Sequence, residues 1–243
     1  MTHGQHIVPP SEQSSGAPRV ATIPRPGHDD GEIVLLADPR VGEIPVVDCG
    51  EPLVELDETF GPARSLVRAG VAQRLRRAQN LLPEGLRLEV VEGHRHPADQ
   101  QSIIDRYAAE VSAERPGLDP YELEVLTSRF VAPIAVAPHV AGAAVDLTLA
   151  DFDGPLDMGT AIDATPEMSG GRCYFDAPDI PERARALRGI LARALGSADL
   201  VNYPTEWWHW SYGDRYWALV TGAPAAVYGP AAPGQLPAAA IKA

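Results

Sequence analysis

The chain has 243 residues, of which 45% are hydrophobic and 22% are charged, as in an ordinary globular protein. A chain of this length can bury roughly 70–75% of the surface that the unfolded chain exposes, which is enough for one sizeable core. The formal net charge of −13 disfavours non-specific binding to nucleic acid or to an anionic membrane, because phosphate groups would be repelled. The two cysteines, Cys49 and Cys173, are too few for a disulfide framework and lack C-x-x-C spacing.

The ends of the chain differ in composition from its middle. Residues 1–30 are rich in Pro, Ser, Gly and His and predict a disordered segment, while the Ala/Pro/Gly-rich residues 222–243 predict a flexible tail. A single domain is expected between them, over residues 31–221. No apolar run approaches the roughly 20 residues of a membrane span, and no secretory signal is readable. We therefore expect a cytoplasmic protein.

Hydrophobic periodicity predicts the elements in chain order. Apolar and β-branched runs predict strands at residues 32–36, 44–47, 86–90, 143–149, 200–203 and 207–212. Helical spacing and start signals predict helices over 62–82, from Pro97 through Val111, over 120–129 and over 181–195. Residues 150–179 are expected to be irregular. Because helices and strands are mixed without regular alternation, we predict one α+β domain with a small, mainly antiparallel sheet flanked by helices.

Two short segments contain the residue types of a catalytic zinc site. His139 and Asp146 lie seven residues apart in the first segment, and Glu206 and His209 lie three apart in the second. Together they supply three metal ligands and a spare carboxylate, the set that a catalytic zinc site uses with one position left open for water. The two segments therefore predict a metallohydrolase with its zinc site in a cleft.

Neither spacing places its two side chains on one face of a regular strand. Gly142 relieves this for the first pair, because His139 can lie in the loop that enters the strand carrying Asp146. For the second pair we expect a bulge, or Glu206 just before the strand that carries His209.

Each segment also has a purely structural interpretation. His139 alone would be a surface-loop histidine, whereas Asp146 lies among apolar residues, where an unpaired carboxylate is costly to bury. The three tryptophans of the second segment should pack in the core first, and would also form a dry wall of the site. They are Trp207, Trp208 and Trp210.

Arg95 lies where a predicted strand ends and a predicted helix begins, a common position for functional groups. Its guanidinium offers a fork of donors that suits an oxyanion or a carboxylate. An ordinary structural ion pair is an equally good interpretation. His94 and His96 flank it, and each alone is expected to be a loop histidine.

The order of these residues resembles a known family. The segments His139-x-x-Gly142-x-Ala144-x-Asp146 and Glu206-Trp207-Trp208-His209 are similar to the two metal motifs of the zinc D-alanyl-D-alanine dipeptidases, which include the vancomycin-resistance dipeptidases. Segments 50–54, 93–97 and 156–163 resemble the family as well, so the resemblance covers roughly residues 44–218.

The resemblance implies zinc-dependent hydrolysis of a small dipeptide, with D-Ala-D-Ala as the foremost substrate. It implies Glu206 as the general base and then acid, and Arg95 as the group that stabilises the oxyanion. Asp163 would receive the free ammonium group of the dipeptide. One zinc ion per chain is implied, with the ligands His139, Asp146 and His209.

Three positions depart from the family pattern. Ala137 stands two residues before the first metal histidine, where the family commonly has a serine linked to substrate recognition. His94 replaces an aromatic residue before Arg95, and His96 is inserted before the following proline. We expect these positions close to the substrate, so hydrolysis of another small amide in a biosynthetic pathway stays an alternative.

Two further alternatives keep the pocket but change its use. Two histidines and one carboxylate also describe the facial triad of non-haem Fe(II) oxygenases. A non-catalytic dipeptide-binding relative would retain the same pocket. Glu206 disfavours both, because neither requires a base beside the metal. The sequence gives no indication of oligomeric state.

Overall fold

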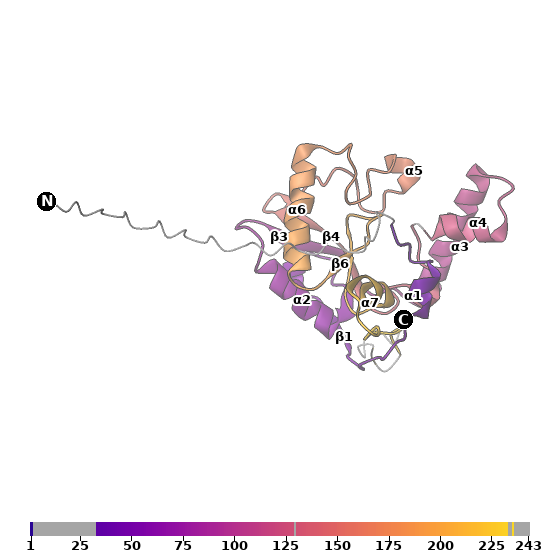
Figure 1. The fold of residues 1–243 in the computed structure, drawn as a ribbon, viewed down its shortest axis with the longest axis horizontal. Helices are drawn as coiled ribbons and strands as arrows, with labels where there is room; N and C mark the ends of the chain where they lie inside the picture. The colour runs from indigo at the N-terminus through magenta and orange to yellow at the C-terminus, as the bar shows by residue number, and fades with distance from the viewer. Residues whose placement is uncertain (2–32, 129, 233–234, 236–243) are drawn as a thin grey trace.

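The computed structural model describes Met1 and residues 33–128, 130–232 and 235. Its main sheet has five antiparallel strands in the order β3-β4-β7-β6, with β5 paired to β4 (Figure 1). These strands are β3 (Arg87–Glu92), β4 (Ala144–Asp151), β5 (Gly154–Pro155), β6 (Val201–Asn202) and β7 (His209–Ser211). A separate antiparallel pair consists of β1 (Leu53–Glu55) and β2 (Leu66–Arg68). The predicted α+β class with an antiparallel sheet is confirmed.

Two helices cover one face of the sheet, α2 (Ala69–Gln79) and α6 (Glu182–Gly196). Side chains at alternate positions of β4 point to them and join the main core, among them Val145, Leu147 and Leu149. Burial of this apolar face is the main stabilising contribution to the fold. The opposite face of β4 is therefore free to carry polar side chains such as Asp146.

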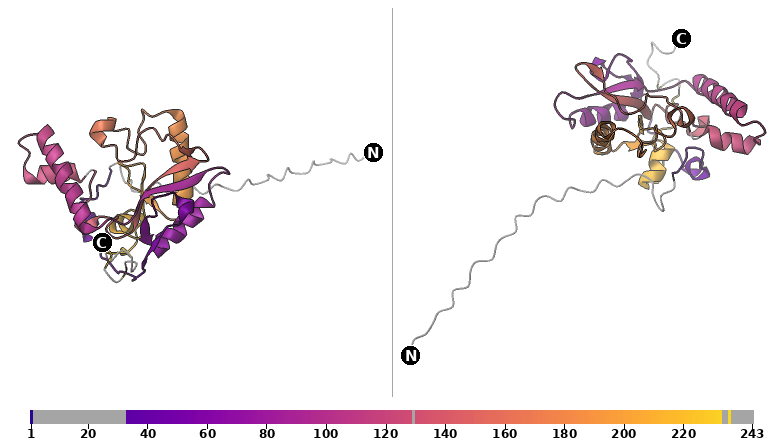
Figure 2. Two further views of the ribbon diagram at one scale, coloured as in Figure 1. Left: turned by 180° about the vertical axis from the view of Figure 1, so that it is seen from behind. Right: turned by 90° about the horizontal axis from the view of Figure 1, so that it is seen from above.

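The remaining helices surround that second face. Figure 2 shows α3 (Pro97–Glu114) and α4 (Pro120–Thr127) set to one side of the sheet, away from α2 and α6. The pair α1 (Pro39–Glu43) and α7 (Arg215–Thr221) packs together elsewhere. Short turns of helix complete the fold, namely η1 (Glu58–Phe60), η2 (Ile134–Val136) and α5 (Pro166–Ser169). Within the described residues, no helix combines the length and the hydrophobicity that crossing a bilayer requires.

Several predicted elements differ from the observed ones. The first helix begins at Ala69 rather than near 62, because Val67 pairs with Val54 between β2 and β1. The predicted strand at 32–36 is wrong for its described residues: Leu36 is buried by packing against Tyr203 and Tyr216 rather than by strand pairing. The predicted strand at 44–47 is reduced to one bridge between Val46 and Ala226. The stretch 150–179, expected to be irregular, contains β5 and α5.

The other predictions hold with shifted ends. The strand predicted at 86–90 is β3 and the strand predicted at 143–149 is β4, whereas the last two strands, β6 and β7, are shorter than predicted. The helices predicted from Pro97, at 120–129 and at 181–195 are α3, α4 and α6. Pro97 is the first residue of α3, and the Nδ1 atom of His96 caps it by accepting from Ala98 N at 3.2 Å.

The predicted flexible tail from Gly222 is wrong as far as residue 232. Tyr228 is buried in the main core, and its hydroxyl donates to Glu51 Oε2 at 2.7 Å. The Gly229 carbonyl accepts from Arg68 Nη2 at 2.8 Å. An aromatic side chain with a place in the core thus fixes an Ala/Pro/Gly-rich segment. The predicted disordered segment 1–30, except Met1, lies outside the described residues, as does most of 233–243.

A fully buried arginine fixes the loop between His139 and β4. Arg68 Nε donates to the Ala141 carbonyl at 2.8 Å, and its backbone N–H donates to the Gly142 carbonyl at 2.8 Å. Gly142 has φ +65°, a left-handed conformation that glycine adopts without strain. A Cβ atom there would lie 2.3 Å from Leu53 Cδ2. The sharp turn that separates His139 from Asp146 therefore requires glycine.

We predict that Gly142→Ala destabilises the protein by more than conformational strain alone. The left-handed backbone should cost about 1–2 kcal/mol, and the overlap with Leu53 about 1–3 kcal/mol more. Urea unfolding measures the sum. Gly85→Ala is the matched control, because Gly85 has φ +84° and no atom within 4 Å of its added Cβ. Equal losses for the two variants would contradict the packing argument.

Candidate metal centre

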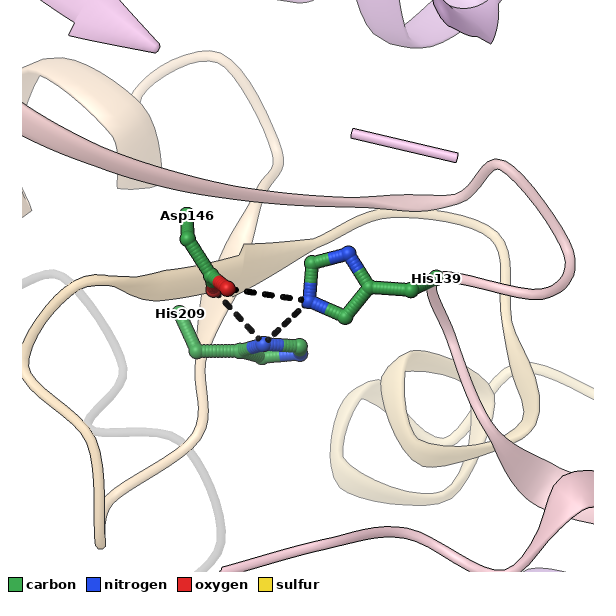
Figure 3. Close-up of side chains that lie close together, drawn as sticks. All are labelled: His139, Asp146 and His209. Atoms are coloured by element: carbon green, nitrogen blue, oxygen red, sulfur yellow. Dashed lines mark hydrogen bonds and ion pairs between the residues drawn. The ribbon is translucent and has the colours of Figure 1, made fainter. Parts of the chain in front are cut away.

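Three buried side chains from separate segments converge on one point (Figure 3). Asp146 on β4 lies directly opposite His209 on β7 in the strand register, and His139 reaches them from the loop after η2. His209 Nδ1 lies 3.1 Å from Asp146 Oδ1, and His139 Nε2 lies 3.3 Å from Asp146 Oδ2. The two imidazole nitrogens are 3.1 Å apart. The structure therefore brings together all three predicted ligands.

A hydrogen bond outside this cluster orients His139. Its Nδ1 lies 2.7 Å from the Gly93 carbonyl oxygen, which can only accept, so Nδ1 carries the proton. The lone pair of Nε2 then faces Asp146 and His209. The backbone N–H of Arg95 also donates to the His139 carbonyl at 3.1 Å. A partner of this kind fixes the tautomer of a metal-binding imidazole.

The cluster has the chemistry of a cation site. One atom from each of the three side chains lies within 4.8 Å of the others, and all three are buried. His209 Nε2 is buried and has no hydrogen-bond partner in the described part of the chain, so Nδ1 is the atom directed at the cluster. Burial alone would raise the pKa of Asp146, but the two imidazoles hold it well below its ordinary value. Two nitrogen donors and one carboxylate match the ligand set of catalytic zinc.

Glu206 lies beside this cluster, in the turn that precedes β7. Its Oε2 is 3.8 Å from His209 Nδ1, and its side chain is buried. The prediction that Glu206 precedes the strand of His209 is confirmed, which resolves the spacing of this pair. Burial, and then the negative charges of Asp146 and Asp163, raise the pKa of Glu206 well above its ordinary value.

Asn202 on β6 holds the backbone of this turn, a role that sequence analysis missed. Its Nδ2 donates to the carbonyls of Glu206 and His209, each at 2.9 Å. The side chain is buried. The bonded carbonyls lie four and seven residues along the chain, but an asparagine at this spacing does not by itself indicate such contacts.

Arg95 is held by two residues that sequence analysis also missed. Its Nε donates to Glu92 Oε1 at 2.7 Å, its Nη2 donates to the other oxygen of Glu92, and its Nη1 donates to Gln100 Oε1 at 2.8 Å. Burial alone would lower the pKa of Arg95, but Glu92 and nearby carboxylates raise it above its ordinary value. Arg95 therefore makes the predicted structural ion pair at a position that also faces the cluster.

A cavity of about 250 Å³ lies over the cluster. The candidate residues from the sequence line it, namely Arg95, His139, Asp146, Asp163, Glu206 and His209. Asp163 comes from the loop before α5, and burial followed by the Asp146 and Glu92 carboxylates raises its pKa. The cavity is thus rich in carboxylates, which favours a ligand with a positive charge.

The departures from the family pattern occupy different places. Ala137 lines the cavity, but His94 and His96 are not among its lining residues. The tryptophans of the second segment lie in the main core and do not line this cavity either. Their structural interpretation is confirmed, and their predicted role as a wall of the site is wrong.

We predict that Asn202→Ala lowers the free energy of unfolding by about 2–4 kcal/mol, because buried carbonyls lose their donor. Hydrolytic turnover should fall as well. The same hydrogen bonds position Glu206, the expected general base, and His209, an expected zinc ligand. Chemical unfolding and steady-state kinetics measure the two effects. Asn80→Ala at the exposed end of α2 is the control. A stability change no larger than that of the control would refute the proposal that Asn202 holds the backbone of this turn.

Comparison with known proteins identifies a family. Residues 56–221 match the family model described as D-ala-D-ala dipeptidase, in the peptidase group M15. A D-alanyl-D-alanine dipeptidase from Synechocystis sp. is 30% identical, and the match covers 72% of this chain and 87% of that protein.

Two solved structures are more distant. VanYB in complex with D-alanine-D-alanine is 17% identical, with a TM-score of 0.38 over 72% of this chain and 87% of that one. A variant of the vancomycin-resistance D,D-pentapeptidase VanY in complex with Zn(II) is 19% identical, with a TM-score of 0.37 over 70% and 88%. The family model covers more than half of this chain, and the resemblance seen in its motifs is confirmed. The chain belongs to the D-Ala-D-Ala dipeptidase family of peptidases.

Proposed function

We propose that the protein is a zinc dipeptidase that hydrolyses D-Ala-D-Ala or a closely similar small dipeptide. The observation that carries this proposal is the buried convergence of His139 Nε2, Asp146 and His209 Nδ1 beside Glu206, in a chain of this family. The named activity of the Synechocystis relative supports the substrate. Another small amide is the second candidate, because Ala137 lines the cavity in place of the family's serine.

In the proposed hydrolysis, the metal cluster and Glu206 have different roles. His139, Asp146 and His209 would hold a zinc ion, which would supply a water molecule of lowered pKa and polarisation of the peptide carbonyl. Glu206 accepts a proton from the attacking water as the new C–O bond forms at the carbonyl carbon. Glu206 then delivers that proton to the amine nitrogen as the C–N bond breaks. Its place beside His209 brings one carboxylate within reach of both transfers.

Arg95 and Asp163 hold the substrate in this proposal. A guanidinium has five N–H donors, and three hydrogen bonds to Glu92 and Gln100 leave two for the developing oxyanion. Asp163 pairs with the free ammonium group of the dipeptide. The carboxylates that line the cavity favour this charge, and the cavity volume of about 250 Å³ favours small substrates.

We predict that Glu206→Gln lowers kcat for D-Ala-D-Ala by at least about a hundredfold, because general base catalysis contributes roughly 10²–10⁴. Bound zinc should be retained, since the cluster itself is unchanged. Release of D-alanine and elemental analysis measure the two quantities. Glu58→Gln, at an exposed position on η1, is the matched control and should keep full activity.

The same assay separates the alternatives. It includes L,L-, L,D- and D,D-dipeptides, so preference for a different small amide is detected directly. Undiminished turnover by Glu206→Gln would refute the mechanism. Tight dipeptide binding by the unaltered protein without any turnover would instead identify a binding protein.

We predict one zinc ion per chain and a protein that zinc stabilises. Restoring zinc to chelator-treated protein at about 100 times its Kd should add about 2.7 kcal/mol to the free energy of unfolding. His209→Ala should remove most of this gain, because it removes a ligand directed at the cluster. Elemental analysis and thermal unfolding test this without reference to activity. One equivalent of iron with oxygen-dependent turnover would instead support the oxygenase alternative.

A further inference from the structure

The segment that carries Asp163 is fixed at both ends by one buried arginine. Arg188 on α6 donates through Nε to the Met158 carbonyl at 2.9 Å and through Nη2 to the Arg172 carbonyl at 3.0 Å. Its Nη1 donates to the Tyr174 carbonyl at 2.8 Å. We call residues 159–171, which lie between these anchors, the arm.

The backbone of the arm has several residues with positive φ, which must be stabilised by contacts with the rest of the protein. Asp163 has φ +63°, which is strained for a residue other than glycine and persists only where the surroundings hold it. Gly159, Gly170 and Gly171 also have positive φ values. The regular structure of the arm is α5, a single helical turn capped by Thr165. Trp207 Nε1 donates to Thr160 Oγ1 at 2.8 Å near the start of the arm. The tip beyond it opens at lower free energy unless a further contact retains it.

A hydrogen bond joins the tip of the arm to α3. Tyr107 Oη donates to Glu167 Oε2 at 3.0 Å, and Glu167 lies on α5, four residues after Asp163. Tyr107 is 6% exposed, and its ring centroid lies 5.2 Å from that of Phe130 in an apolar cluster under α3. The tyrosine is thus held in place by its packing, whereas Glu167 lies at an exposed position on α5.

The two partners lie on two segments that both line the cavity. Asp163 and Thr165 of the arm contribute to its lining, and so do Gln100 and Tyr107 of α3. In Figure 1, α5 lies between α6 and the pair α3 and α4. The Tyr107–Glu167 hydrogen bond connects α5 to α3. The distance between Asp163 and the metal cluster therefore depends on how firmly the tip is held.

We propose that the Tyr107–Glu167 hydrogen bond latches the arm across the cavity and thereby sets selectivity for substrates with a free amino group. Tyr107 and Glu167 are positioning residues in this scheme, because they act through Asp163. The selectivity part rests on the proposed function, whereas the latch itself does not. A released arm would withdraw Asp163 and leave room for an acyl group on the substrate nitrogen.

The test compares zinc-loaded, full-length Tyr107→Phe and Glu167→Ala with the unaltered protein. Tyr121→Phe is the matched control, because Tyr121 on α4 is 73% exposed. Hydrogen exchange of residues 159–171 is measured first and should be faster in both variants but not in the control. The ratio of kcat/KM for D-Ala-D-Ala to that for N-acetyl-D-Ala-D-Ala is measured next. It should fall about tenfold, the loss expected for one hydrogen bond to a charged group.

The outcomes are distinguishable. Unchanged exchange of residues 159–171 in both variants overturns the latch, whatever the kinetics. Faster exchange with an unchanged selectivity ratio overturns its role in amine recognition. If the unaltered protein hydrolyses no dipeptide, the proposed function fails, while faster exchange in both variants still supports the latch. A variant that loses its thermal transition is replaced by Glu167→Leu, which keeps most of the bulk of the side chain but cannot accept a hydrogen bond from Tyr107.

Discussion

The pairing of β4 with β7 places Asp146 directly opposite His209, and the rest of the site depends on this register. Side chains alternate along a strand, so the same register turns Val145 and Trp210 towards the main core while the two polar side chains face the cavity. A shift of β7 by one residue would turn His209 towards the apolar helices, at a large cost in free energy. The hydrophobic core on one face of the sheet thus enforces the ligand geometry on the other.

The remaining site residues lie on irregular backbone, and buried polar side chains replace the missing sheet hydrogen bonds. Arg68 holds the turn after His139, Asn202 holds the turn that carries Glu206, and Arg188 holds both ends of the arm. All three donate to main-chain carbonyls. Those bound by Arg68 and Arg188 are distant in sequence, whereas those bound by Asn202 lie four and seven residues away. Loops alone would leave these carbonyls unsatisfied and mobile. Precise geometry on loops is thereby obtained without regular secondary structure.

These supports explain where prediction from sequence succeeds and where it fails. The residue types and spacing in the two metal segments, with Gly142 in the first, indicate the ligands and the turn, because metal chemistry and left-handed backbone restrict which residues fit. Val67 fits the hydrophobic spacing of a helix as well as that of a strand. Its secondary structure is therefore decided by pairing with β1 in the folded protein. Tyr228 gives no periodic signal in its Ala/Pro/Gly-rich surroundings. Glu92 and Asn202 lie only a few residues from their partners, but a carboxylate or an amide at such a spacing does not by itself indicate a contact.

The cavity combines a rigid wall with a wall that is held at a few points. The face formed by β4 and β7 is continuous with the core, so the candidate metal ligands and Glu206 share its stability. The wall that carries Asp163 is held by Arg188 at both ends, by Trp207 at Thr160 and by Tyr107 at its tip. Bond cleavage requires fixed distances, whereas substrate entry requires an opening. In the proposed function Asp163 binds the ammonium group, and its place on the wall of the arm would let the cavity open without disturbing the residues proposed to perform the chemistry.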